Sequence, residues 1–122
     1  MNDDALKLTL IAARAADDKL ADNISVRDVG DIFGISEAFV IVSGRNDRHV
    51  RSIVDGVVDA IREHGGRKPL RIEGREDANW VLVDFGEIVA HVFLEETRVF
   101  YDLDRLWSDA PQVEWAESTP VG

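Results

Sequence analysis

The chain has 122 residues, no cysteine, and 14 basic against 24 acidic residues, which gives a net charge of −10 at pH 7. This length predicts one domain. The lack of cysteine excludes disulfides, thiolate metal sites and a cysteine nucleophile. The negative charge disfavours unaided binding to a phosphate backbone. It instead suits attraction to a basic protein, although it also fits a role in solubility alone.

No run of about 18 apolar residues is present, so the sequence predicts no membrane-spanning segment. The chain starts with an acidic stretch instead of the basic and apolar regions that are typical of a secretory signal peptide. We therefore expect a cytoplasmic protein.

The first half of the chain alternates between helical and extended patterns. Apolar residues at spacings of three and four predict a helix over residues 6–20, which Asn2 or Asp3 can cap. Ile24 and Val26 alternate with polar residues and predict a short strand. Residues 38–42 form a continuous apolar run, which is typical of a strand that is buried on both faces.

The clearest helix follows that buried strand. Asn46 can cap it, and Gly65 and Gly66 end it. Its apolar residues fall on one face, at Val50, Ile53, Val54, Val57, Val58 and Ile61. Residues 70–73 predict the next strand, and residues 80–93 predict a hairpin that turns through residues 85–87. Residues 103–107 predict a final turn or helix against the edge of the sheet.

The C-terminal part is acidic. Residues 95–122 hold seven acidic and two basic residues, and prolines interrupt the last stretch. We expect a domain over residues 1–107 and an acidic, flexible tail over residues 108–122.

No catalytic, cofactor or metal site is predicted. The turn Ser43-Gly44-Arg45-Asn46 joins a strand to a helix, where backbone amides can bind an anion. It has neither the glycines nor the lysine of a phosphate-binding loop, so a plain turn is favoured. His49, His64 and His91 lack the spacing of zinc ligands. His91 shares a strand face with apolar residues, which favours a core or rim histidine over an acid–base role.

Aromatic residues are the main candidates for recognition. A chain of this size cannot bury all of Trp80, Phe93, Phe100, Tyr101 and Trp107 well, and Trp and Tyr are enriched among interface anchors. Trp80, Leu82 and Asp84 share one face of their strand, an amphipathic pattern that fits a binding surface or a partly covered edge strand. The pattern by itself leaves interface and core open.

Several segments together resemble the ribosomal silencing factor family, also called Iojap-like, over about residues 4–111. The matching stretches lie in order at residues 39–43, 46–50, 73–74, 80–87, 91–93 and 98–107. The resemblance implies a single α/β (α+β) domain with a mixed sheet of about five strands flanked by helices. It also implies a topology like that of nucleotidyltransferases without their catalytic residues.

The resemblance further implies a function. Family members bind large-subunit ribosomal protein fourteen, block the joining of the two ribosomal subunits and damp translation when nutrients are scarce. Trp80 matches the tryptophan of the ribosomal-protein contact, and Tyr101 matches the aromatic residue after the last strand. Asp84 and Glu95 are candidates for pairing with basic residues of the partner. Glu73 and His91 match motif positions in which support of the sheet and contact are not separated.

Other functions remain as alternatives. A homodimer is implied by the resemblance, and a plain dimeric scaffold is a further possibility because exposed sheets self-associate. A nucleotidyltransferase-like protein would bind a nucleotide with magnesium near residues 43–46. We expect no cofactor, no membrane contact and no direct sequence-specific binding of nucleic acid.

Overall fold

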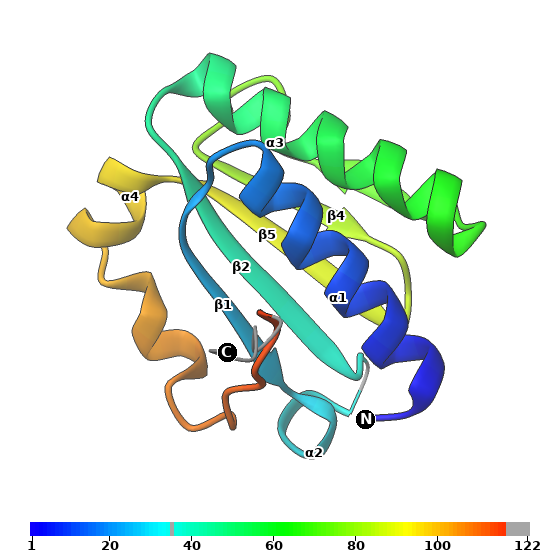
Figure 1. The fold of residues 1–122 in the computed structure, drawn as a ribbon. Coiled ribbons are helices and arrows are strands. Elements are labelled where there is room, and N and C mark those ends of the chain that lie inside the picture. The colour runs from blue at the N-terminus through cyan, green and yellow to red at the C-terminus, as the bar shows by residue number, and fades with distance from the viewer. Residues whose placement is uncertain (35, 117–122) are drawn as a thin grey trace, which may run out of the picture.

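The computed structural model describes residues 1–34 and 36–116, and the side chains at 32 and 33 are not described. It is built around a five-stranded mixed sheet in the order β1-β2-β5-β4-β3 (Figure 1). The elements are α1 (Asp3–Asp18), β1 (Asp22–Asp28), α2 (Gly30–Phe33), β2 (Ala38–Gly44), α3 (Asp47–Ala60), the π-helical turn η1 (Ile61–Gly65), β3 (Arg71–Glu73), β4 (Trp80–Asp84), β5 (Ile88–Leu94), α4 (Glu95–Phe100) and the 3₁₀ turn η2 (Leu103–Trp107). The expected α+β domain with about five strands is confirmed.

Both long helices begin where the sequence predicts a cap. The Asn2 side chain accepts a hydrogen bond from the backbone N–H of Ala5 at 2.7 Å. The Asn46 side chain accepts one from the N–H of His49 at 2.8 Å. Each cap satisfies an N–H that has no partner within the first helical turn.

The strand order places the last predicted hairpin in the middle of the sheet. β2 pairs with β5 in parallel, whereas β1 with β2, β5 with β4, and β4 with β3 are antiparallel. β3 therefore runs parallel to β2, with β5 and β4 between them. Since β2 and β5 end together, with Gly44 opposite Leu94, α3 and α4 both start from the same end of the sheet.

The two faces of the sheet are covered unequally. α1 and α3 lie side by side over one face (Figure 1) and bury its alternating apolar residues, among them Val40, Val42, Val81 and Val92. On the opposite face, α4 and η2 cover β2 and β5, and Trp107 packs there with Ile41 and Phe93. The β4–β3 half of this second face keeps only partly buried or exposed side chains.

The segment after η2 runs along the outer edge of β1. The N–H of Val113 donates to the carbonyl of Val26 at 2.8 Å, and the N–H of Asp28 donates to the carbonyl of Pro111 at 2.9 Å. Val113 and Trp115 also pack against the core beneath the helices. The described part of the expected tail, residues 108–116, thus includes a stretch that lies against the domain, and residues 117–122 fall outside the described residues. No helix among the described residues is long and apolar enough to cross a bilayer.

Candidate partner-binding surface

The uncovered half of the second sheet face is the candidate binding surface. We call it the open sheet face and define it by five residues of β4 and β3: Trp80, Leu82, Asp84, Arg71 and Glu73. Strand alternation places them on one side, because Leu82 lies opposite Glu73 and Asp84 lies opposite Arg71 in the antiparallel register. Four of the five are charged or aromatic, which gives this face the amphipathic character that the sequence predicts.

Trp80 lies at the boundary between the covered and the uncovered half. Its residue surface is 39% exposed, and its ring packs on Phe93 with the ring centroids 4.9 Å apart. Trp107 meets it edge to face at 6.4 Å, and the indole N–H donates to Nδ1 of His91 at 3.0 Å. Trp80 is therefore both a support of the core and a surface residue.

His91 lies beneath Trp80 and is only 5% exposed. Phe39 packs against its ring at 4.5 Å and Trp107 at 5.2 Å. Burial among these rings lowers the pKa of His91 to about 4, because a charged imidazole is poorly solvated there. The structure thus places this predicted site residue in the core, directly under the surface and neutral at pH 7.

The acidic residues of the open sheet face are already paired. Arg71 contacts the carboxylates of both Asp84 and Glu73, at 3.3 Å in each case. Asp84 also closes the β4–β5 hairpin, since its carboxylate accepts from the N–H of Gly86 at 2.8 Å. A basic partner at this surface would compete with Arg71 for these carboxylates.

α4 carries a second group of exposed apolar side chains beside the open sheet face. Phe100 is 77% and Tyr101 66% exposed, and their rings lie edge to face at 4.9 Å. Together with Thr97 and Leu94 they line a shallow hollow that ends at Asn79, the residue before Trp80. Tyr101 and Asn79 therefore line the same hollow, whereas Trp80 itself is not among the residues that line it.

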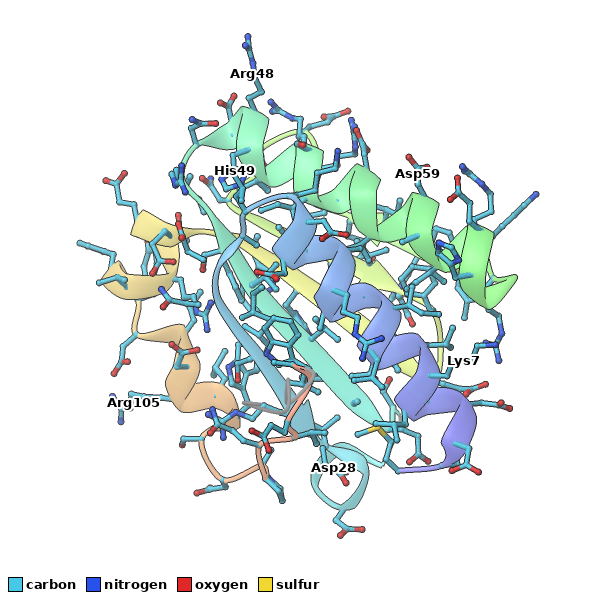
Figure 2. The ribbon with its side chains drawn as sticks, viewed as in Figure 1. Lys7, Asp28, Arg48, His49, Asp59 and Arg105 are labelled. Atoms are coloured by element: carbon cyan, nitrogen blue, oxygen red, sulfur yellow. The ribbon has the colours of Figure 1, made fainter. Side chains whose placement is uncertain are left out.

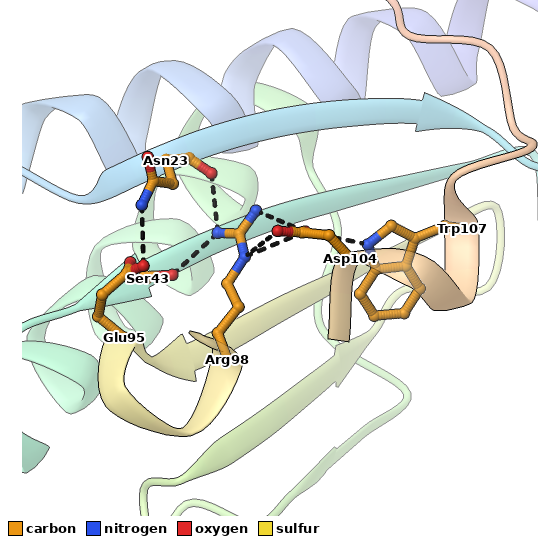
Figure 3. A network of polar contacts seen from close by, with 6 residues as sticks. All are labelled: Asn23, Ser43, Glu95, Arg98, Asp104 and Trp107. Atoms are coloured by element: carbon orange, nitrogen blue, oxygen red, sulfur yellow. Dashed lines mark hydrogen bonds and ion pairs between the residues drawn. The ribbon is translucent and has the colours of Figure 1, made fainter. Parts of the chain in front are cut away.

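A buried arginine holds α4 and η2 in place (Figure 3). Arg98 is 4% exposed and donates to the Asp104 carboxylate at 2.9 Å, to the Ser43 hydroxyl at 2.8 Å and to the Asn23 carbonyl at 2.8 Å. It therefore joins the segment that carries the exposed aromatics to the ends of β1 and β2. No role for Arg98 is predicted from the sequence. The sequence feature that could have pointed to Arg98 is its charge, since it is one of only two basic residues in the acidic stretch from residue 95 onward.

Glu95 lies apart from the open sheet face, at the start of α4. One of its carboxylate oxygens accepts a hydrogen bond from the Asn23 side chain at 2.9 Å (Figure 3). The other is buried and has no hydrogen-bond partner among the described residues. The structure thus places Glu95 beside the Arg98 network and not with Asp84 and Glu73.

The turn before α3 uses its amides internally. His49 lies in the first turn of α3 (Figure 2). The N–H of Arg45 donates to Nδ1 of His49 at 3.0 Å, and the other ring nitrogen of His49 contacts the Lys19 carbonyl at 2.7 Å. The N–H of Arg48 donates to the Asp47 side chain. Hydrogen bonds from the Arg51 side chain and the Arg48 N–H hold the pKa of the Asp47 carboxyl below its usual value. An anion would have to displace these partners and face the Asp47 carboxylate.

Within the described part of the chain, no group of three or more histidine, aspartate or glutamate side chains is placed to hold a metal ion. The described residues expose part of a tryptophan, a pair of aromatic rings at Phe100 and Tyr101, and the carboxylates of Asp84 and Glu73. Aromatic anchors within a polar surround are the usual composition of protein–protein interfaces.

The family model and the similar proteins point to the same family. Residues 2–121 match the family model described as "Ribosomal silencing factor during starvation". The ribosomal silencing factor of Bacillus subtilis is 41% identical over 101 residues, which cover 83% of this chain and 85% of that protein. That of Zymomonas mobilis is 35% identical, covering 82% and 74%.

A mitochondrial relative and solved structures extend the comparison. The mouse protein named "Mitochondrial assembly of ribosomal large subunit protein 1" is 36% identical over 90 residues, 72% of this chain and 40% of that protein. The crystal structure of a Chromobacterium violaceum protein covers all of this chain and 95% of its own, with a TM-score of 0.81 and 27% identity. A Bacillus halodurans structure gives a TM-score of 0.74 and 35% identity, over 85% of this chain and 93% of its own. The chain belongs to the ribosomal silencing factor family.

Proposed function

We propose that this protein is a cytoplasmic translational repressor that binds large-subunit ribosomal protein fourteen and sterically blocks the joining of the two ribosomal subunits. In this proposal the bound domain damps translation when nutrients are scarce and acts by bulk alone, without a chemical step. Family membership supports a ribosomal partner. The proposed role is regulatory, with no catalytic residue and no cofactor.

The observation that carries the proposal is the exposure of three aromatic side chains, Trp80 at the start of β4 and the pair Phe100 and Tyr101 at the end of α4. Large aromatic side chains in this setting are the residues that most often dominate binding energy. The carboxylates of Glu73 and Asp84 and the net charge of −10 suit a basic partner, since complementary potentials speed association and select the partner.

Co-sedimentation with isolated large subunits at moderate salt tests the binding step, with small subunits as the control. We expect selective pelleting with large subunits. Trp80→Ala should weaken it about 30-fold, the equivalent of roughly 2 kcal/mol for an interface anchor, and Tyr101→Ala should weaken it in the same direction. Trp115→Ala makes the same change at a residue that packs on the helix-covered core, and it should leave binding unchanged.

The blocking step needs its own assay. Large subunits that are saturated with the protein are mixed with small subunits, and the associated fraction is read from a sucrose gradient. We expect it to fall as occupancy rises. A folded Trp80→Ala variant that pellets as well as the parent would show that the site is wrong, and unimpaired subunit joining at full occupancy would contradict the steric mechanism.

The nucleotide-binding alternative predicts heat on titration with ATP and magnesium. The N–H groups of Arg45, Arg48 and His49 at the turn into α3 are already bonded within the protein, so we expect no measurable heat. Sedimentation equilibrium measures the expected homodimer independently of ribosome binding.

A further inference from the structure

The only polar atom of the Trp80 side chain is directed into the protein. The indole N–H donates to Nδ1 of His91 at 3.0 Å, while 39% of the residue surface remains exposed. Phe93 and Trp107 contact the same ring. What Trp80 offers to a partner is therefore a carbon surface whose hydrogen-bond donor is already used.

A histidine at this buried position costs free energy that an apolar side chain would not. An imidazole that accepts at Nδ1 carries its proton on Nε2, and this Nε2 is buried with no nitrogen or oxygen partner among the described residues. The ring of Phe39, at 4.5 Å, offers at most a weak contact to such a donor. A buried donor left unpaired costs about 1–3 kcal/mol, so a phenylalanine or leucine would fill this apolar site at a lower cost. The single hydrogen bond that the His91 side chain makes within the described structure is the one to Trp80.

The neutral state of His91 is required for this bond. Burial lowers the pKa of His91 to about 4, so at pH 7 the imidazole is uncharged and Nδ1 stays an acceptor. The rings around it, those of Phe39, Phe93, Trp80 and Trp107, bring no charge that would stabilise a proton on Nδ1.

We propose that His91 is a positioning residue for recognition: its Nδ1 fixes the orientation of the Trp80 indole and withdraws the indole N–H from the surface. The part that concerns recognition rests on the proposed function. Fixing the ring before binding reduces the conformational entropy that is lost on association. With its donor used, Trp80 selects a partner group that packs on the ring, an apolar or cationic side chain, over one that accepts a hydrogen bond.

Two substitutions separate positioning from packing. His91→Phe keeps a ring of similar size but has no acceptor. His91→Asn loses the ring but keeps an acceptor, because Oδ1 of asparagine is as many bonds from Cα as Nδ1 of histidine. A purely structural role predicts that phenylalanine is the better replacement, whereas positioning predicts that asparagine is. His64→Asn, at an exposed histidine, is the matched control.

The first measurement uses the protein alone. In ¹⁵N-labelled protein the indole N–H signal of Trp80 is assigned by its loss in Trp80→Phe, and its exchange with solvent is timed at pH 7. We expect slow exchange in the parent, in His91→Asn and in His64→Asn, and exchange at least about tenfold faster in His91→Phe. Exchange in the parent at the rate of free indole would overturn the positioning role.

The second measurement is the affinity for isolated large ribosomal subunits. We expect a loss of about tenfold for His91→Phe and substantial recovery for His91→Asn. Full affinity in His91→Phe, with the indole shown to be released, would overturn the role in recognition. If the parent binds no subunits while the exchange pattern is as expected, the positioning of Trp80 stands and the proposed function fails.

Discussion

Replacement of Arg98 tests whether one buried side chain holds the segment that carries the exposed aromatics. Arg98→Met keeps most of the side-chain volume and removes every hydrogen bond of the guanidinium. The Ser43 hydroxyl and the Asn23 carbonyl would each lose a partner, and Ser43 is fully buried. Asp104 is a smaller concern, because its side chain is 56% exposed and water can replace the arginine.

The magnitude follows from these environments. A buried polar group that is left without a partner costs about 1–3 kcal/mol. Ser43 is such a group, whereas Asn23 is exposed and water can replace the arginine there as at Asp104, so the expected loss is about 2 kcal/mol. For a domain of this size that equals a fall in Tm of roughly 7 °C. Arg98→Lys should recover only part of the loss, because lysine keeps the charge without the planar fork that reaches three partners at once.

Urea unfolding followed by circular dichroism measures this loss. Arg105→Met is the matched control, since Arg105 lies in η2 (Figure 2). Its side chain is 81% exposed and pairs with Asp102 at 3.8 Å. It should leave the unfolding midpoint unchanged. An Arg98→Met protein as stable as the parent would refute the reasoning, because it would show that the network is not required to hold α4 and η2.

Two further predictions concern stability. The pKa of His91 is about 4 in the folded protein and about 6.5 when unfolded. Between these two values the unfolded state therefore binds more protons than the folded state. The free energy of unfolding should keep its full value above pH 6.5 and decrease towards pH 4, by about 3 kcal/mol in all. Urea midpoints from pH 8 to 4.5 should therefore fall more steeply for the parent than for His91→Phe, and parallel curves would contradict the assignment. Gly74 has φ +83°, and a Cβ there would meet the Trp80 carbonyl oxygen. Gly74→Ala should lower the free energy of unfolding, measured with urea, by at least about 1–2 kcal/mol from the left-handed backbone alone. Gly66→Ala is the control and should cost less, because Gly66 has a positive φ but open space around it.

Local signals in the sequence were sufficient for most of the elements. The apolar stripe of α3, the Asn46 cap and the uninterrupted apolar run of β2 depend on neighbours within a few residues, and the structure confirms them. α4 was not predicted, because residues 95–100 are too few to show a helical period. A local sequence pattern also cannot predict that β5 lies between β2 and β4, because this order depends on the parallel pairing of strands about 50 residues apart.

The candidate site was partly predictable for the same reason. Strand alternation places Trp80, Leu82 and Asp84 on one face, but their exposure depends on how far η2 extends across the sheet. The Arg98 network could not be predicted, because Asn23, Ser43 and Asp104 come from three separate parts of the chain. The contact of the segment after η2 with β1 is likewise long-range, and its prolines and acids indicate a loop when considered alone.

The unequal cover of the two sheet faces means that the extent of the open sheet face is set by one short connection. α3 and α4 leave the same end of the sheet, yet α3 with η1 runs over 19 residues (Asp47–Gly65) whereas α4 has only six. Since a helix rises about 1.5 Å per residue, α4 is about 9 Å long, and the chain turns back through η2 before it reaches β3. A longer segment at this point could cover more of the open sheet face and leave every strand pairing intact. In this fold the cover of that face and the stability of the sheet can therefore change independently through loop length alone.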